Sequence, residues 1–164
     1  MNLIKNFDQK KKLILNKENI YVLFFIILIF TFDRFSKIEI INNFSANTYF
    51  INNFINFDLI WNIGIGFGLL SSESNIIYNS ITILIGIVII ILFSICIASE
   101  YFEKLIFSVI IGGALGNFYD RLLYNAVPDF IDVHYNSYHW FTFNVADIFI
   151  TLGIIFFLMR GFLK

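Results

Sequence analysis

The chain has 164 residues and a net charge of −1; 59% of its residues are hydrophobic, only 14% are charged, and its mean hydropathy is +0.79. A soluble domain of this length could not bury so much apolar surface, so the composition excludes an ordinary soluble protein and favours a single integral membrane domain. The charge distribution gives no sign of a nucleic-acid partner. The single cysteine, Cys96, cannot form an internal disulfide, and its apolar surroundings are typical of a small membrane-buried residue.

Four apolar segments are long enough to cross a bilayer, for which about 20 residues are needed. The first follows a polar, basic start over residues 1–18 and reaches spanning length only if its helix continues through the DRFSK stretch. No small-residue cleavage site follows it, which favours a retained helix over a cleaved signal peptide. We therefore expect one membrane domain over residues 19–164, with helices at about 20–38, 75–98, 104–122 and 142–161.

The basic residues that flank these helices predict an orientation. Lysines precede the first helix, Lys104 lies between the second and third, and Arg160 and Lys164 follow the fourth. The two long loops, residues 39–74 and 123–141, contain no lysine or arginine. Because basic residues are enriched in cytoplasmic segments, we expect both termini in the cytoplasm and both long loops outside.

The first long loop contains the stretch TYFINNFINFDLIWN, in which aromatic and β-branched residues partly alternate with polar ones. This pattern predicts short β-strands that rest on the membrane surface. The stretch leads into NIGIGFG, whose glycines allow backbone angles or close approaches that other residues do not. The glycine spacing differs from that of a dinucleotide-binding fingerprint.

Polar and ionisable residues gather at the predicted outer ends of the helices, at a depth where charge is costly. Asp33 and Lys37 are four residues apart on the first helix, so they share a face and can pair. The other members lie on the third helix, on the fourth helix and in the loop between them: Asn117, Asp120, Arg121, Asp129, Asp132, Asn144 and Asp147. No comparable cluster is expected at the inner ends. Any one of these residues alone is explained as an interfacial residue whose side chain extends to the lipid headgroups, but the cluster as a whole indicates a functional site.

The residue types in this cluster limit the kinds of catalysis that it can perform. The only histidines, His134 and His139, have no neighbouring glutamate in a zinc-protease motif, and no serine stands in a nucleophile elbow. No metal or other cofactor is expected. The remaining candidates for catalytic groups are the carboxyls. Two neighbouring aspartates can share a proton, so that one activates water while the other protonates a carbonyl or leaving amine. The cluster therefore predicts aspartyl protease chemistry by two converging aspartates.

Two other classes of function are open. A small transporter or proton-path protein would also place aspartates inside a bundle, but it should show internal repeats or polar groups on both sides of the midplane. The sequence shows neither feature. A non-catalytic scaffold subunit would explain the outer loops, but not two aspartates supported by asparagines at helical spacing.

Five stretches, in this order, resemble the motifs of the bacterial lipoprotein signal peptidase (signal peptidase II) family of intramembrane aspartic proteases: DRFSK, NIGIGFG, GGALGNFYDR, VPDFIDV and FNVAD. Gly66 stands where alanine is usual in the second motif, and Pro128 stands where valine is usual in the fourth. The resemblance covers nearly all of the chain after its basic start. It implies an all-α membrane protein with four transmembrane helices and a small β-rich extracytoplasmic cradle on the outer membrane surface.

The resemblance also implies an activity and its residues. Asp129 and Asp147 correspond to the catalytic dyad, and the substrate-binding or supporting positions are Asp33, Lys37, Asn62, Gly64, Phe67, Asn117, Asp120, Arg121, Asn144 and Ala146. The implied reaction removes the signal peptide of a diacylglyceryl-modified prolipoprotein, just before the lipidated cysteine, without a cofactor. The implied location is the bacterial inner membrane, with the active site near the outer leaflet. We expect a monomer that contacts membrane lipid, and a catalytically inactive family member is the alternative.

Spacing predicts how some of these side chains support the dyad. Asn144 precedes Asp147 by three residues and is expected to orient it. Asn117 and Asp120 are expected to anchor the loop that carries Asp129. Arg121 adjoins Asp120 in sequence, so the two do not face each other on a helix. We expect Arg121 to hold loop carbonyls, or a lipid or substrate group.

Overall fold

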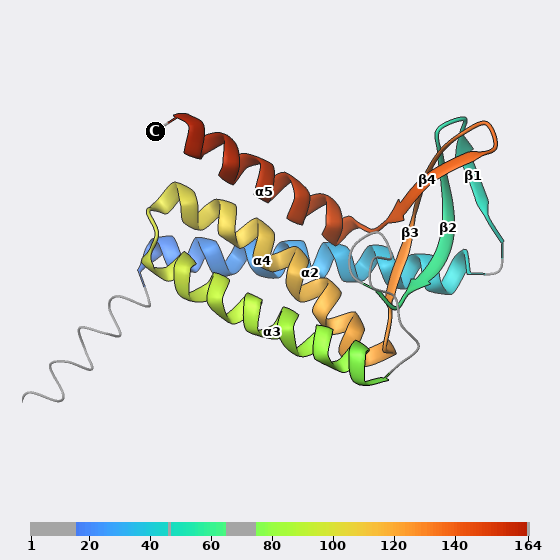
Figure 1. The fold of residues 1–164 in the computed structure, drawn as a ribbon. Helices are drawn as coiled ribbons and strands as arrows, with labels where there is room; N and C mark the ends of the chain where they lie inside the picture. Colours follow the sequence, from blue (N-terminus) through green and yellow to red (C-terminus); the bar gives the residue numbers. More distant parts are fainter. Residues whose placement is uncertain (1–15, 46, 65–74, 164) are drawn as a thin grey trace, which may run out of the picture.

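The computed structural model describes residues 16–45, 47–64 and 75–163, and Figure 1 shows a bundle of helices with a sheet at one end. The helices are α2 (Lys17–Asn43), α3 (Asn75–Ala98), α4 (Tyr101–Tyr124) and α5 (Val145–Leu163). Each of them is long and apolar enough to cross a membrane. The described helices, together with a small antiparallel sheet, confirm the predicted fold class.

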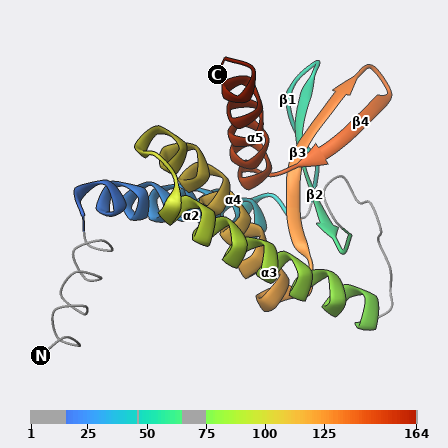
Figure 2. The ribbon, with the colours of Figure 1, turned by 60° about the vertical axis from the view of Figure 1, so that its left-hand side comes forward.

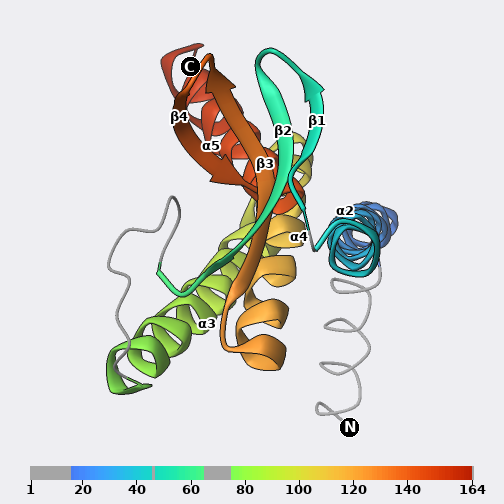
Figure 3. The same cartoon turned by 90° about the vertical axis from the view of Figure 1, so that its right-hand side faces the viewer.

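Helix α4 is the centre of the bundle. It packs against α2, α3 and α5, and the end view in Figure 3 shows it between the other three. In its spanning segment 56% of the residues are buried, whereas only 17–28% are buried in the spanning segments of the other helices. The outer helices therefore present mostly apolar side chains to their surroundings, as is usual for helices that pack in lipid.

Glycines let α4 approach its neighbours closely, as the GGALG stretch predicts. A Cβ atom on Gly112 would lie 2.9 Å from a side-chain carbon of α2, and one on Gly113 would lie 2.7 Å from the carbonyl oxygen of Ala146 on α5. A Cβ on Gly116 would overlap the carboxylate of Asp33. Small residues thus set the spacing of both α2 and α5 against α4.

Helix α2 is longer than the apolar segment predicted. Its N-cap is Asn16, whose Oδ1 accepts the backbone N–H of Asn19 at 2.7 Å. It continues to Asn43 rather than ending near residue 38, because no glycine or proline interrupts it and the Asn43 side chain donates to Glu39 at 2.7 Å. Helix α4 also extends slightly beyond its predicted ends.

Charged residues also pair at the end of the bundle away from the sheet, where no polar cluster was expected. Lys104 Nζ donates to Glu18 Oε2 at 3.1 Å and links α4 with α2. Arg160 Nη2 donates to Glu100 Oε2 at 2.8 Å and links α5 with the start of α4. The two carboxylates are exposed, so these pairs are not comparable with the buried polar groups at the sheet end. Each of these carboxylates has a cation as its partner, and such pairs tie helices together.

The sheet has four antiparallel strands in the order β1–β2–β3–β4, and their bounds are β1 (Tyr49–Asn52), β2 (Ile55–Asn62), β3 (Val127–Tyr135) and β4 (Tyr138–Phe143). Figure 2 shows the two hairpins together at one end of the bundle. The first hairpin confirms the predicted strands of the first long loop. The second long loop was expected only as a loop, but it forms β3 and β4 because β3 finds a partner in β2, far away in the sequence.

Strand β3 connects α4 with the sheet, and β4 leads to α5. Helix α4 ends at Tyr124, its C-cap residue Asn125 has a left-handed φ of 54°, and β3 begins almost at once. Pairing with β4 starts only at Ile131, so Pro128 lies where β3 is paired on one side and its missing N–H is tolerated. Because β4 runs to Phe143, α5 starts at Val145 and not at residue 142.

Candidate active site

Asn144 lies between two carboxyl groups that come from different elements. Its Nδ2 donates to Oδ1 of Asp129 on β3 at 2.6 Å, and its backbone N–H donates to Oδ2 of Asp147 on α5 at 3.2 Å. Asn144 is fully buried, and Asp129 is 3% exposed. The fold therefore brings together the two aspartates that the sequence pairs as a dyad.

A second asparagine binds the other oxygen of Asp129. Asn62, at the end of β2, donates from Nδ2 to Asp129 Oδ2 at 2.8 Å. The side-chain oxygen of Asn62 accepts the N–H of Gly64 at 2.8 Å, and that of Asn144 accepts the N–H of Asp147 at 3.1 Å. Because a backbone N–H must meet an oxygen, both amides are held with their NH₂ groups toward Asp129.

The surroundings of Asp129 shift its ionisation. Burial raises the pKa of Asp129 to about 6, and repulsion from Asp147 adds to this effect. The hydrogen bonds from Asn62 and Asn144 and the charge of Lys37 lower the same pKa, by less. A carboxyl with a pKa near 6 exchanges its proton near neutral pH, as a proton-transfer group must.

Asp147 belongs to the N-terminal cap of α5. Asn144 accepts the N–H of Asp147, and Asp147 accepts the N–H of Asn144, which is the reciprocal arrangement of a capping box. Asn144 thus holds Asp147 in the way its spacing predicts. Asp147 Oδ1 accepts a further bond from Asn117 Nδ2 at 2.8 Å. Asn117 therefore supports Asp147 and does not anchor the strand of Asp129, so that expectation was wrong.

Lys37 is the centre of a buried ionic cluster between α2 and α4. Its Nζ donates to Asp33 Oδ2 at 2.8 Å, which confirms the predicted pair, and to Asp120 Oδ2 at 2.7 Å. It also donates to Asn117 Oδ1 at 2.8 Å. Asp33 Oδ1 accepts the N–H of Ala146, at 2.9 Å, and so binds the first turn of α5. Asp120 pairs with cations of α2 and does not anchor the Asp129 strand, which corrects its expected role.

Arg34 is a member of this cluster that the sequence analysis missed. Its guanidinium donates to Asp120, and it lies 4.9 Å from the ring centroid of Tyr119 and 5.8 Å from that of Tyr124. Arg34 is only 8% exposed. A signal was present, because Arg34 is a charged residue at membrane depth within the DRFSK stretch.

Arg121 binds the loop that follows β2. Its Nη2 donates to the carbonyl oxygen of Gly64, as expected for a side chain that holds loop carbonyls. Its guanidinium lies 5.6 Å from the ring centroid of Tyr78 on α3, and the Tyr78 hydroxyl donates to the Arg121 carbonyl at 3.1 Å. Tyr78 was not identified from the sequence. Phe67 and Gly66, which the family motif includes, lie outside the described residues.

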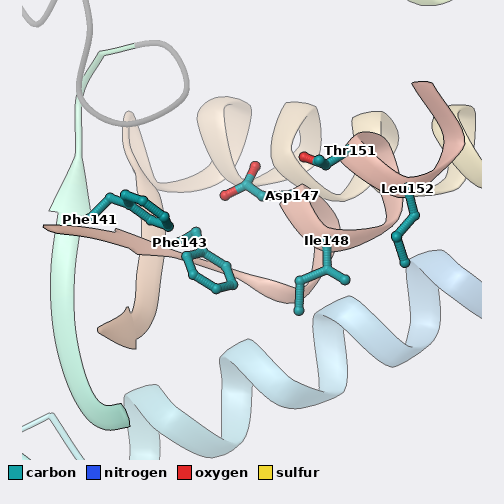
Figure 4. Close-up of a pocket in the computed structure, with 6 residues that line it drawn as sticks. All are labelled: Phe141, Phe143, Asp147, Ile148, Thr151 and Leu152. Carbon is teal, nitrogen blue, oxygen red and sulfur yellow. The ribbon is translucent and has the colours of Figure 1, made fainter. Parts of the chain in front are cut away.

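A cavity of about 290 Å³ opens beside Asp147. Figure 4 shows the Asp147 carboxylate among side chains of β4 and α5, most of which are apolar. The lining residues are Phe141, Phe143, Asp147, Ile148, Thr151 and Leu152. The arrangement places one carboxyl of the pair next to a space suited to an apolar group.

The two histidines lie farther along the sheet. His139 Nδ1 is 2.7 Å from Asp132 Oδ2, and the rings of His134 and His139 stack with centroids 5.3 Å apart. Asp132 therefore pairs within the β3–β4 hairpin, so it is a neighbour of the candidate site and not a part of it.

Comparison with known sequences identifies the family. The model of the family described as Signal peptidase (SPase) II matches residues 25–163, which is most of the chain. The chain belongs to the signal peptidase II family. The lipoprotein signal peptidase of Pelagibacter ubique is 49% identical over 144 residues, covering 85% of this chain and 87% of that protein. The lipoprotein signal peptidase of Francisella tularensis subsp. novicida is 38% identical over 140 residues, covering 79% and 83%.

Two solved structures share the fold of this chain. A bacterial membrane enzyme solved at 2.3 Å resolution has a TM-score of 0.75 and 28% identity, covering 87% of each chain. A second, solved at 1.9 Å resolution, has a TM-score of 0.71 and 29% identity, covering 85% of this chain and 91% of its own. With four helices able to span a bilayer, the chain is a bacterial membrane protein of this family.

Proposed function

We propose that the chain is an aspartic endopeptidase that removes the signal peptide from diacylglyceryl-modified prolipoproteins, cutting just before the lipidated cysteine. One observation carries the proposal: Asn144 binds two carboxyls from separate elements, Asp129 and Asp147, beside an apolar cavity. The names of the relatives, which are lipoprotein signal peptidases, support the substrate class.

Two carboxyls in one site share a proton, because both cannot ionise easily at close range. In the singly protonated state, the carboxylate takes a proton from water while the water oxygen attacks the scissile carbonyl carbon. The protonated partner donates to the carbonyl oxygen at the same time. Asn62, Asn117 and Asn144 hold the two side chains in fixed directions, which is the positioning that this chemistry needs.

The membrane determines how the substrate reaches this site. Asp147 lies in the first turn of a helix able to span the bilayer, so the dyad is at the membrane boundary. The cavity beside it suits an apolar group next to the scissile bond, and the lipid tails of the substrate stay in the bilayer. The distribution of lysine and arginine supports cytoplasmic termini and an active site near the outer leaflet.

The test is cleavage by the purified protein in liposomes, with a diacylglyceryl-modified prolipoprotein and the same protein without the lipid as substrates. We expect the lipidated form to be cut at least a hundredfold faster, with mass spectrometry identifying the lipidated cysteine as the new N-terminus. Equal cleavage of both forms would contradict the substrate class. A folded protein that cleaves neither form would overturn the proposal and would favour an inactive family member, or a proton-path protein if the liposomes also leak protons.

A further inference from the structure

Lys37 is a buried ammonium group with all of its donors in use. Its side chain is fully buried, and an ammonium has three N–H donors. Two of them bind carboxylates, and the third binds an amide; the acceptors are Asp33 Oδ2, Asp120 Oδ2 and Asn117 Oδ1, at 2.8, 2.7 and 2.8 Å. The third bond connects the cluster to the dyad.

Asn117 links Lys37 with Asp147. Because an ammonium can only donate, the Asn117 oxygen must face Lys37, which turns Nδ2 toward Asp147 Oδ1 at 2.8 Å. The positive charge polarises the amide and strengthens its N–H as a donor. Asp147 also lies in the first turn of α5, where a helix favours negative charge. Burial disfavours the ionised form of Asp147, and both effects oppose that penalty.

Asp129 is held in a different way. Its oxygens accept bonds from the amides of Asn62 and Asn144, and the oxygens of those amides accept the backbone N–H groups of Gly64 and Asp147. Asp129 lies on strand β3 and not in the first turn of a helix. Burial and repulsion from Asp147 raise its pKa to about 6, so Asp129 can hold a proton near neutral pH.

The charges of the site favour a dyad that holds a proton. The charged groups that act on Lys37 and the dyad come from α2, α4, α5 and β3, and with Lys37 they are two cations and four carboxyls: Arg34, Lys37, Asp33, Asp120, Asp129 and Asp147. Four ionised carboxyls would exceed the two cations, so a proton on the dyad reduces the excess negative charge in a largely buried site.

We propose that Lys37 is a positioning residue whose charge, transmitted through the amide of Asn117, keeps Asp147 ionised as the base of the dyad while Asp129 keeps the proton. This inference rests on the proposed peptidase function, which it deepens by giving each carboxyl a separate role. Lys37 does not touch the substrate; it acts on Asp147.

The assigned roles account for every proton. Asp147 takes a proton from water, the water oxygen bonds to the scissile carbon, and Asp129 protonates the carbonyl oxygen, giving a neutral gem-diol. When the C–N bond breaks, Asp147 gives its proton to the leaving nitrogen. One hydroxyl of the diol returns a proton to Asp129 as the carbonyl re-forms. The products are a carboxylic acid and an amine, and the dyad regains its starting state.

The test measures the pH dependence of kcat/KM for cleavage of the lipidated prolipoprotein in detergent. The Asp33→Asn/Lys37→Gln double variant removes both charges of one ion pair, so neither charge is left without its partner. The amide oxygen at position 33 can still accept the N–H of Ala146, as the carboxylate oxygen does. Loss of the cation makes the base harder to ionise, and loss of the Asp33 carboxylate offsets this effect only in part, so we expect the acidic limb to move to higher pH by up to about one unit. At a pH on that limb we expect kcat to fall by up to about tenfold, with KM within about threefold of wild type.

A second variant keeps the test decisive if the first does not fold. Asn117→Leu leaves both ion pairs of Lys37 in place and removes the amide that bonds to Lys37 and to Asp147, so it should shift the acidic limb in the same direction. Lys104→Gln is the matched control, because Lys104 is a buried lysine paired with Glu18 at the opposite end of the bundle. We expect this variant to change stability and leave the pH profile in place.

The outcomes separate the inference from the proposed function. If the acidic limb does not shift in the variants that fold, the proposed role of Lys37 is overturned. If it shifts in the double variant but not in Asn117→Leu, the route through the amide of Asn117 is overturned. A wild-type protein that does not cleave the lipidated substrate overturns the proposed function itself.

Discussion

At the scale of single residues, Asn144 contributes two interactions that can be separated. Its amide NH₂ binds Asp129, while its side-chain oxygen and backbone N–H complete the cap with Asp147. Serine caps a helix about as well as asparagine does, but it has no amide to offer Asp129. Asparagine at this position is therefore required by the dyad and not by the helix alone.

Asn144→Ser should reduce cleavage at least tenfold with a change in the free energy of unfolding below about 0.5 kcal/mol, because the cap survives. Asn144→Ala should reduce cleavage similarly and also destabilise the protein by about 1 kcal/mol, because the cap is lost. Thermal unfolding in detergent and a cleavage assay distinguish the two variants. An Asn144→Ser variant with wild-type activity would show that the contact with Asp129 is dispensable.

The pKa of Asp129, raised to about 6 by burial and by Asp147, predicts a pH dependence. Asp129 donates a proton in the proposed mechanism, so kcat/KM should decline as pH rises through about 6 and the donor ionises. A bound substrate excludes more water and raises that pKa further, so the alkaline limb of kcat should lie at higher pH than that of kcat/KM. Initial rates between pH 4 and 9 test this, and a kcat/KM that still rises above pH 7 would contradict it.

At the scale of elements, the position of α5 against α4 depends on Gly113. A Cβ at this position would lie 2.7 Å from the carbonyl oxygen of Ala146 and 3.0 Å from Ile150, and a backbone carbonyl cannot move without its helix. The turn that would have to shift carries Asp147.

Gly113→Ala should therefore destabilise the protein by about 1–3 kcal/mol and reduce cleavage at least tenfold, because small displacements of a reacting group are costly. Gly161→Ala in the same helix α5 is the matched control, since within the described part of the chain no atom lies within 4 Å of its Cβ position. It should be neutral or, through helix propensity, stabilising by up to about 1 kcal/mol. Unfolding midpoints and cleavage rates of both variants provide the measurement, and equal behaviour would contradict the packing argument.

The elements differ in how far the sequence predicts them. Four apolar segments were sufficient to locate the helices, because spanning length and hydropathy are local properties. The strands at residues 127–143 were not predicted, since they depend on pairing of Ile60 with Asp129 and of Ile131 with Phe143. Such pairing joins distant segments and leaves only a weak local pattern, whereas the alternation in the first loop could be recognised.

At the scale of the whole molecule, the motifs located the site before its contacts were known. Every described residue expected at the site lies near the sheet end of α2, α4 and α5 or on the strands beside it. The partners were less predictable: Asn117 binds Asp147, and Asp120 binds Lys37 and Arg34. Spacing shows which residues share a helix face, but it does not show which helix that face meets.

The orientation of the molecule in the membrane can be tested with single cysteines after Cys96 is replaced by serine. Phe54→Cys, at the exposed turn between β1 and β2, should react with a membrane-impermeant maleimide added to intact spheroplasts. Ser99→Cys, between α3 and α4, should react only after the membrane is permeabilised, because the positive-inside rule places that turn in the cytoplasm. The opposite pattern would reverse the proposed orientation.

The central claim is that Asp129 and Asp147 together perform the cleavage. The most direct measurement is the rate at which Asp129→Asn and Asp147→Asn variants cut a lipidated prolipoprotein, with Asp58→Asn in β2 as a matched control whose contact with Thr48 an asparagine can keep. We predict that each dyad variant loses at least a thousandfold in rate while remaining folded in thermal unfolding, and that the control keeps wild-type activity. A folded Asp129→Asn or Asp147→Asn variant that cleaves within tenfold of the wild-type rate would contradict the account.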